Sequence, residues 1–298
     1  MIQFGTNPIA WANDDDQSLG ADIPTERILE EAGRLIGFDG IENGHRWPQD
    51  DPQALMELLG GYGLTFVSGW HSMNVLAHSV EQEKQAIQPH LDKLKHNGCK
   101  VCIACETSNS IQGRDLPLSA RPVLDAQGMK EFGAKVEEIA QYCADQGIAL
   151  VYHHHMGTVV QSPEDIDAFM AATGPATKLL FDAGHCYFGG GDPAGILARH
   201  VSRVGHFHAK NVRPAIRAQV EANGLSFMDG VRAGVFTVPG DQEGGVDFEP
   251  LLRILKGYGY DGWIVIEAEQ DPDQRNPLLY QTLGLHTLKR IARETGLI

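Results

Sequence analysis

Short apolar runs alternate along the chain with amphipathic segments that carry helix start signals. Eight of these runs have the length and the apolar character of strands that are buried on both faces. The runs cover residues 2–7, 38–43, 64–71, 100–106, 148–155, 178–185, 203–210 and 263–269. Buried strands in regular alternation with helices predict an α/β protein with a parallel sheet.

The segments between the runs begin as helices usually do. Asp51, Ser162 and Asp192 each stand directly before a proline, so a capping side chain precedes proline at the first helical position. In residues 25–37, apolar residues that include Leu35 recur at helical spacing. The pattern therefore predicts a helix after most of the strands.

Eight strand-and-helix units predict a single (β/α)8 barrel domain, a TIM barrel, over residues 1–298. The strand starts run from residue 2 to residue 263, which suits a barrel of about 250 residues. An open doubly wound sheet is the alternative, but no GxGxxG turn follows an early strand. The connections after strands four and seven, about 107–127 and 211–262, are long, and such loops usually build the active-site face of a barrel.

Composition narrows the classes of partner. The chain has 39 acidic residues against 24 Lys and Arg, a formal net charge of −15, which disfavours nucleic acid as a partner. No stretch reaches the roughly 20 apolar residues of a membrane span, and the N-terminus lacks the pattern of a signal peptide. Five cysteines show no disulfide framework. We expect a cytoplasmic protein that does not bind membranes, and a homo-oligomer remains open.

Ionisable residues gather at the C-terminal ends of the expected strands. They are Glu42, His71, Glu106, His153, His155, Asp182, His185, His208, Glu267 and Glu269. These ends meet at one mouth of a barrel, and alternate residues of each strand point inward. We therefore expect convergence, with Cys102 and Ala104 beneath Glu106 inside the barrel and His154 facing the helices.

A divalent cation would stabilise such a cluster, because burying an ion without a counter-charge costs several kcal/mol. We expect four ligands, one from each of strands five to eight: His153, Asp182, His208 and Glu267. Mixed imidazole and carboxylate ligands suit Mn²⁺, Co²⁺, Zn²⁺ or Fe²⁺ better than Mg²⁺, and Mn²⁺ or Co²⁺ is our expectation. His155 and His185 would contact substrate or orient the ligands.

Several motifs carry a family resemblance. They are the Asp-x-x-His of residues 182–185, "NPIAWANDD" (7–15), "YHHHMGT" (152–158), "HFHAKNVR" (206–213) and "GVFTVPGD" (234–241). With these motifs the chain resembles the xylose-isomerase-like barrel superfamily, and within it the inosose (2-keto-myo-inositol) dehydratases. One departure matters: many members of the superfamily end strand five with Glu-Asn-His, and this chain has three histidines, His153 to His155, in those positions.

The resemblance implies a metal-dependent lyase of inositol catabolism. It would dehydrate the small polyol 2-keto-myo-inositol to a deoxy-diketo-inositol through an enolate. The base is left open among His155, His185 and Glu106. Further expected site residues are Lys210 and Glu267 in catalysis, and Asn7, Trp11, Glu42, His71 and Arg213 at the substrate.

Three other functions compete with this one. A metal-dependent sugar epimerase or isomerase would share the fold and the enolate. An endonuclease IV-like enzyme with three zinc ions would need more histidines on strands three and four, where only His71 is present. A sugar-binding sensor on the same barrel would bind the polyol without converting it.

Overall fold

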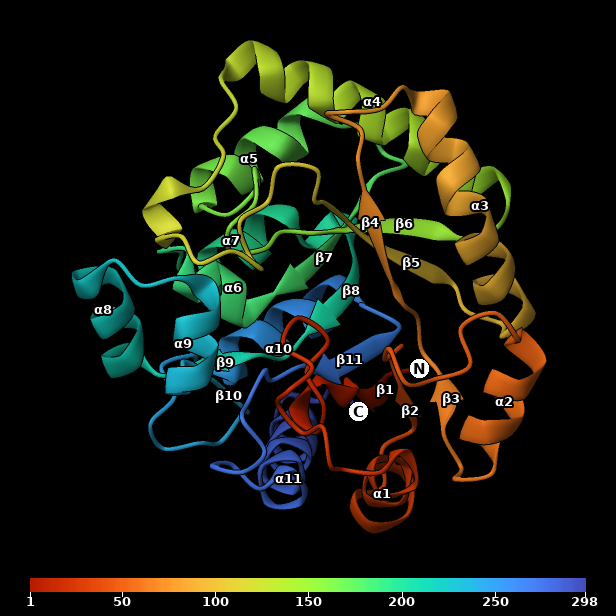
Figure 1. Ribbon diagram of the computed structural model, residues 1–298, viewed down its shortest axis with the longest axis vertical. Coiled ribbons are helices and arrows are strands. Elements are labelled where there is room, and N and C mark those ends of the chain that lie inside the picture. Colours follow the sequence, from red (N-terminus) through yellow and green to blue (C-terminus); the bar gives the residue numbers. More distant parts are fainter.

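A curled parallel sheet forms the centre of the computed structural model, which describes residues 1–298 (Figure 1). Its spatial order is β3-β2-β1-β11-β8-β7-β6-β5-β4. The strands are β1 Gln3–Thr6, β2 Gly40–Ile41, β3 Thr65–Phe66, β4 Trp70–Met73, β5 Val101–Glu106, β6 Ala149–His153, β7 Lys178–Asp182, β8 Val204–His208 and β11 Trp263–Ile266. Each of the eight expected runs contains a strand, and the third is divided between β3 and β4.

The sheet closes into a barrel through this divided third strand. β3 pairs with β2 on one side, and β4 pairs with β5 on the other. The three residues between them contact both neighbours: Val67 N donates to Ile41 O at 3.0 Å, and Ser68 Oγ donates to Val101 O at 2.7 Å. β3 and β4 thus act as one bent barrel strand, and the (β/α)8 barrel is confirmed.

The bend also changes which side chains of the third strand point inward. Phe66 and Met73 both belong to the core between sheet and helices, although they lie seven positions apart. Residues an odd number apart in a regular strand face opposite sides. The segment from Val67 to Gly69 therefore shifts the alternation by one residue.

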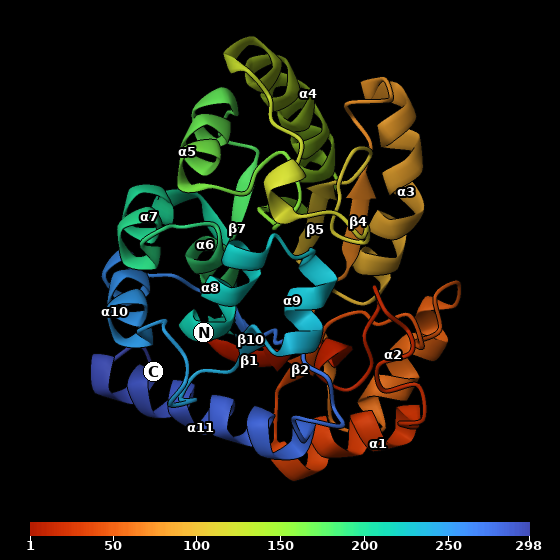
Figure 2. The same cartoon turned by 60° about the vertical axis from the view of Figure 1, so that its left-hand side comes forward.

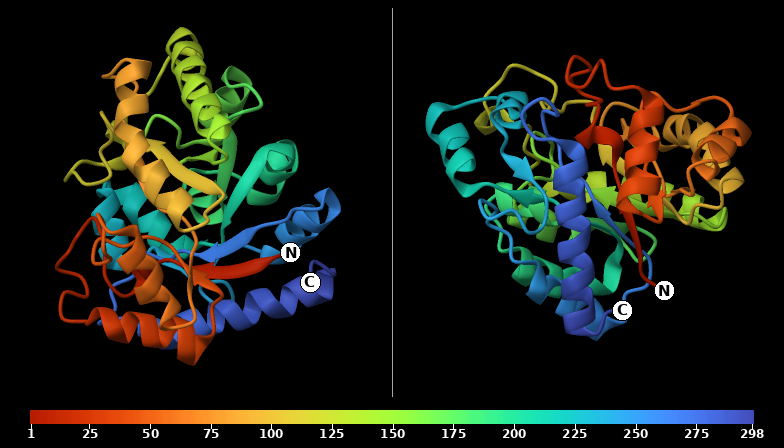
Figure 3. Two further views of the ribbon diagram at one scale, coloured as in Figure 1. Left: turned by 90° about the vertical axis from the view of Figure 1, so that its right-hand side faces the viewer. Right: turned by 90° about the horizontal axis from the view of Figure 1, so that it is seen from below.

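Helices surround the sheet (Figures 1 and 3). They are α1 Thr25–Leu29 with the π-helix η2 Glu30–Ile36, α2 Pro52–Gly60, α3 Val80–His96, α4 Ala126–Asp145, α5 Pro163–Ala172, α6 Ala183–Phe188, α7 Pro193–His200, α10 Phe248–Tyr258 and α11 Pro277–Thr295. Asp51, Ser162 and Asp192 cap α2, α5 and α7, as expected. Leu35, expected on the buried face, is exposed, because the wider repeat of the π-helix turns it outward.

The core has two layers. Sixty buried residues pack between the sheet and the helices, including Ile264, Ile266 and Ala268 around β11. Inside the barrel, Ile103, Val151 and Leu180 form a small separate cluster. The inner cluster fills the floor beneath the C-terminal ends of the strands, so the polar residues above it rest on an apolar base.

The long seventh connection folds beside the mouth of the barrel. It contains the antiparallel pair β9 Asn211–Val212 and β10 Phe236–Thr237, with α8 Pro214–Asn223 and α9 Phe227–Ala233 between them (Figure 2). Nine buried residues of this region and its neighbours, among them Phe188, Phe227 and Phe236, form a cluster of their own. The connection after β5 holds only the short 3-10 helix η3 Leu118–Ala120.

Four smaller features concern the end of one strand, the cysteines, the helices and the termini. The expected strand 178–185 ends at Asp182, because α6 begins at the next residue and takes in His185. All five cysteines are buried and unpaired. No helix of the structure combines the length and apolar character that a membrane crossing requires. Both termini lie at the end of the barrel where β1 begins (Figure 3).

Candidate metal centre and active site

Four ionisable side chains meet at the C-terminal ends of β6, β7, β8 and β11. His153, Asp182 and His208 are the last residues of their strands, and Glu267 directly follows β11. One ligand atom from each lies within 4.8 Å of those of the other three. His208 Nδ1 is 3.4 Å from Asp182 Oδ2 and 3.2 Å from Glu267 Oε2. The structure thus brings together the four residues that the sequence suggested as ligands.

These four residues fit a metal ion, because the atoms that they direct to the centre of the group have no hydrogen-bond partner outside it, apart from the Lys210 ammonium beside Glu267. The atoms are His153 Nε2, Asp182 Oδ2, His208 Nδ1 and Glu267 Oε2. Buried polar atoms are rarely left without a partner. Two imidazole nitrogens and two carboxylate oxygens could hold a divalent first-row transition ion.

Neighbouring groups orient the ligands by binding their other polar atoms. His153 Nδ1 donates to His154 O at 2.7 Å, which leaves Nε2 as an acceptor. His208 Nε2 lies 3.1 Å from Glu42 Oε1, and donation there leaves Nδ1 free in the same way. Asp182 Oδ1 accepts from His185 N at 2.7 Å. Such outer contacts fix the tautomer and direction of metal-binding groups.

The electrostatics favour the charged form of two carboxylates at the site, Glu267 and Glu42, whereas burial raises the pKa of Asp182. Burial would raise the pKa of Glu267, but Lys210 and His208 hold it well below its usual range. Burial likewise opposes the charged form of Glu42, yet His208 and His206 lower its pKa to about 2. Burial lowers the pKa of His153 well below that of free histidine, so its imidazole is neutral and can act as a ligand.

A buried lysine stands beside the four-residue group. Lys210 Nζ lies 2.7 Å from Glu267 Oε2, 2.8 Å from Glu269 Oε1 and 3.0 Å from His185 Nε2. The two carboxylates keep its pKa above the ordinary value despite complete burial. His155, His185 and Glu269 are also close enough to one another to bind a cation. The Lys210 ammonium supplies the positive charge there.

His155 connects this second group to the open pocket. Its ring lies 3.9 Å from that of His185 and 5.1 Å from Phe227 of α9, measured between centroids. Its Nδ1 donates to Met156 O at 2.8 Å, so Nε2 keeps a lone pair. Burial, followed by the charge of Lys210, lowers its pKa to about 4. His155 is therefore a neutral imidazole with one free acceptor.

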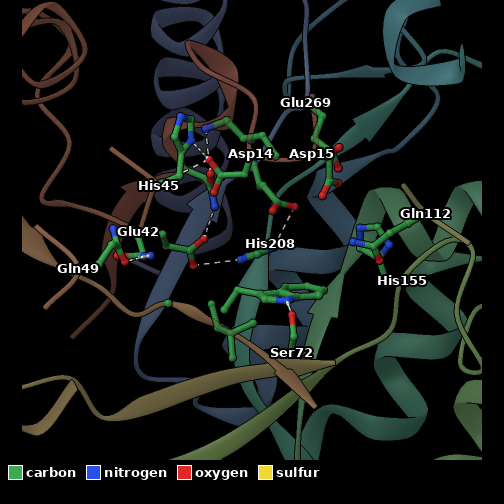
Figure 4. Close-up of a pocket in the computed structure, with 17 residues that line it drawn as sticks. Asp14, Asp15, Glu42, His45, Gln49, Ser72, Gln112, His155, His208 and Glu269 are labelled. Carbon is green, nitrogen blue, oxygen red and sulfur yellow. Dashed lines mark hydrogen bonds and ion pairs between the residues drawn. The ribbon is translucent and has the colours of Figure 1, made fainter. Parts of the chain in front are cut away.

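A pocket of about 460 Å³ opens over these groups (Figure 4). Of the residues expected at the site, Asn7, Glu42, His155, His208 and Glu267 line it. Asn7 Nδ2 donates to Glu42 Oε2 at 2.8 Å. His153, Asp182, His185 and Lys210 are buried beneath it. A cavity of this size and polarity suits a small polar ligand.

Two expected strand-end residues lie outside the pocket because they face the helices. Glu106 lies on the same side of β5 as Cys102 and Ala104, which pack in the outer core and not inside the barrel as expected. Its carboxylate accepts from Val75 N and Ser108 N. His71 is turned outward by the bend in the third strand, and its Nε2 lies 2.7 Å from Glu83 Oε1 on α3.

Two expected substrate contacts in loops instead support the structure. The buried Trp11 donates through Nε1 to Glu31 Oε2 at 2.7 Å, away from the pocket. Arg213 is buried in the seventh connection, where it donates to Phe236 O and pairs with Asp241. It holds β10 and the loop that follows, and it does not line the pocket. His154 faces the helices as expected and accepts from Asp182 N through Nε2.

The structure also adds pocket residues to which sequence reasoning gave no role in the site, although Glu269 was expected at the mouth. They are Ile9, Asp14, Asp15, Asn43, His45, Gln49, Gly69, Trp70, Ser72, Ile103, Gln112 and Glu269. His206, buried beneath the mouth, contacts Glu42 Oε1 through Nε2 at 2.8 Å. The spacing of His206 and Glu269, two residues from His208 and Glu267, was the signal that could have given them a role. The loop residues carried no comparable signal.

Comparison with known proteins agrees with this architecture. Residues 30–290 match the family described as "Xylose isomerase-like TIM barrel". The chain is 42% identical to the rhizopine catabolism protein MocC of Rhizobium meliloti, covering 99% of this chain and 90% of that protein. It is 39% identical to the inosose dehydratase of Geobacillus thermodenitrificans (strain NG80-2), covering 94% and 93%.

Solved structures extend the likeness of the fold. The crystal structure of the probable 3-DHS dehydratase AsbF from Bacillus anthracis superposes with a TM-score of 0.67 at 15% identity, covering 96% of this chain and 98% of that one. The likeness at this identity concerns the fold alone. The chain belongs to the xylose isomerase-like TIM barrel family and, within it, to the family of the inosose dehydratases.

Proposed function

We propose that this protein is a metal-dependent inosose dehydratase, which removes water from 2-keto-myo-inositol to give a deoxy-diketo-inositol. The observation that carries the proposal is the convergence of His153, Asp182, His208 and Glu267 at the mouth of a barrel, where three of the four converging atoms have no hydrogen-bond partner outside the group. The nearly full-length similarity to proteins named inosose dehydratase supports the choice of substrate.

The same four residues are the proposed ligands, and Mn²⁺ or Co²⁺ is the proposed ion. The ion, when bound, supplies Lewis-acid stabilisation of the negative charge that develops on a ketone oxygen. The donor set is consistent with Mn²⁺ and Co²⁺, because both accept imidazole as well as carboxylate ligands. Glu42 contributes indirectly by orienting His208.

His155 is the proposed base. Of the three candidates, it alone lines the pocket: His185 is covered by neighbouring rings, and Glu106 faces the helices. Its free Nε2 would accept the proton as the C–H bond next to the ketone breaks. The electron pair of that bond forms the enolate, and the hydroxyl on the adjacent carbon leaves as water after it receives a proton.

Lys210 holds this arrangement together by charge. Its ammonium binds Glu267 and Glu269 at once, so both carboxylates keep fixed positions beside the pocket. It also lies against the face of Phe236, 4.4 Å from the ring centroid. The apolar side of the site, built from Phe227 and Phe236, shields His185 from water. We propose that Lys210 positions the carboxylates and does not transfer a proton.

The test is product identification with purified protein. We expect the ultraviolet absorbance of an enolised diketone when the protein with Mn²⁺ or Co²⁺ is incubated with inosose. Treatment with a chelator should remove the activity, and either ion should restore it. Full activity in metal-free protein would refute the metal role. An isomerised inosose that retains all its oxygen atoms would instead identify an epimerase or isomerase.

The variant His155→Asn tests the proposed base. Loss of a general base lowers the rate by typically 10²–10⁴-fold. Metal content should remain unchanged, because His155 is outside the four-residue group. His78→Asn is the matched control, since His78 is an exposed histidine away from the pocket. Equal rates in the two variants would exclude His155 as the base.

A further inference from the structure

The pocket is lined by acidic side chains without basic ones to balance them. Five carboxylates line it, and no lysine or arginine does. They belong to Asp14, Asp15, Glu42, Glu267 and Glu269. A divalent ion in the four-residue group would offset Asp182 and Glu267, and Lys210 offsets one more carboxylate. The rim therefore keeps a negative charge even with the ion in place, and it repels an anionic ligand.

The loop after β1 places Asp15 on this rim. Asn13 Oδ1 accepts from the backbone N–H groups of Asp15 and Asp16, at 2.8 Å each, and so fixes the turn. The Asp14 carboxylate is 2.5 Å from His45 Nδ1. The Asp16 carboxylate pairs with Arg232 of α9 at 2.8 Å. Asp15 forms neither contact, and its exposed side chain lines the pocket together with that of Gln112.

Glu269 offers a second acceptor at the same place. Its Oε1 accepts from Lys210, whereas its Oε2 is buried and has no hydrogen-bond partner. Figure 4 shows the side chains of Asp15 and Glu269 beside each other at one side of the pocket. Glu269 Oε2, a buried acceptor without a donor, and the Asp15 carboxylate beside it indicate a ligand that donates hydrogen bonds.

We infer that Asp15 and Glu269 form a subsite for a hydrogen-bond-donating substituent of the ligand. The pocket then prefers an aminocyclitol, in which an ammonium replaces one ring hydroxyl, to the neutral cyclitol, and it excludes cyclitol phosphates. The inference rests on the proposed function, from which it takes the ring-shaped polyol as ligand.

Aminocyclitols, neutral cyclitols and cyclitol phosphates differ in the hydrogen bonds that they can make with Asp15 and Glu269. A hydroxyl donates one hydrogen bond, so it satisfies Asp15 or Glu269 but not both. An ammonium has three donors, so it can bind both carboxylates at once, and its positive charge adds an attraction that a hydroxyl lacks. A phosphate brings acceptors and negative charge to a place that already holds both.

Direct calorimetric titration of the Mn²⁺-loaded protein tests the inference without relying on turnover. The ligands are myo-inositol, an amino-deoxy-inositol and an inositol monophosphate. We expect the amine to bind about tenfold more tightly than the neutral ring, which is the effect of one hydrogen bond to a charged group. The phosphate should show no measurable binding. Asp15→Asn and Glu269→Gln should each remove most of the preference for the amine.

Asp115→Asn is the matched control, because it removes the same charge at an exposed position outside the pocket lining. It should keep the preference for the amine. Equal affinities for amine and neutral ring in the unmodified protein would overturn the inference, as would an unchanged preference in Asp15→Asn or the binding of none of the ligands. Turnover of inosose by the same sample decides the proposed function separately.

Discussion

The substitution Lys210→Met tests the charge balance on which the whole centre depends. It removes a fully buried ammonium that lies 2.7 Å from Glu267 Oε2 and 2.8 Å from Glu269 Oε1. Removing one partner from a buried ion pair typically costs about 3–5 kcal/mol, because the remaining charge is left unpaired. We expect metal-free Lys210→Met to lose this amount in free energy of unfolding.

Bound metal should reduce that loss in a predictable way. A divalent ion in the four-residue group would compensate Glu267 but not Glu269, so Mn²⁺ should restore roughly half of the lost free energy. The assay is urea unfolding of each protein with chelator and with Mn²⁺, followed by circular dichroism. A loss of the same size in both conditions would refute the argument that the ion and the lysine share Glu267.

Lys93→Met is the control for a buried lysine without a carboxylate partner. Lys93 is also buried, but its Nζ binds only the amide oxygen of Gln49, at 3.1 Å. Burial lowers the pKa of Lys93, which shows that its charge is poorly compensated. We therefore expect its replacement by methionine to cost much less than that of Lys210, and to respond equally with and without Mn²⁺.

Three further predictions concern metal binding and acid stability. Glu42→Gln should weaken metal affinity about 10–100-fold, measured by competition with a chelating dye, because the orienting contact to His208 loses its charge; unchanged affinity would argue against that role. Glu267→Gln should lower both the rate and the metal bound per chain, and an unchanged metal content would show that Glu267 is not a ligand. Burial lowers the pKa of His90 to about 4, so the folded protein binds fewer protons than the unfolded chain below about pH 6.5, and stability falls as the pH drops. Between pH 7 and pH 5, the free energy of unfolding measured with urea should fall by about 2 kcal/mol less in His90→Gln than in the unmodified protein. Identical losses would contradict the lowered pKa of His90.

The sequence predicted the barrel and the four-residue group well because both follow from strand periodicity. Parallel buried strands must end at the same mouth, and a residue two positions above an inward apolar residue also points inward. Val151 and Leu180 lie in the inner cluster, and His153 and Asp182 follow them at that spacing. These placements required no knowledge of the loops.

The wrong predictions concern strands for which the sequence does not determine which side chains point into the barrel. A shift of one residue moves every side chain of a strand to the other face. The bend between Val67 and Gly69 produces such a shift, and His71 consequently faces α3. For Glu106, the apolar residues of β5 fit either face, since Cys102 and Ala104 are small and Ile103 can pack inside. Only the pairing of β5 with its neighbouring strands determines which of its faces points into the barrel.

The loop residues of the site were beyond prediction for a different reason. Asp15 and Gln112 reach the pocket because the connections after β1 and β5 fold back over the mouth. Their positions depend on contacts across the chain, such as Asp16 with Arg232, which lie 216 positions apart. Local sequence carries no period that encodes such a contact. Trp11 and Arg213 were misassigned for the same reason, because both make their contacts within loops.

The division between strands and loops has a functional consequence. The proposed metal ligands lie at the ends of strands that are fixed by the sheet, whereas Asp14, Asp15 and Gln112 lie on connections outside it. A loop can therefore change which polyol is bound without moving the metal. Sites on rigid elements keep their geometry better than sites on loops. Proteins of this family that bind different polyols should consequently differ in the connection after β5, and an exchange of residues 107–116 between two of them should change ligand preference while metal affinity stays the same.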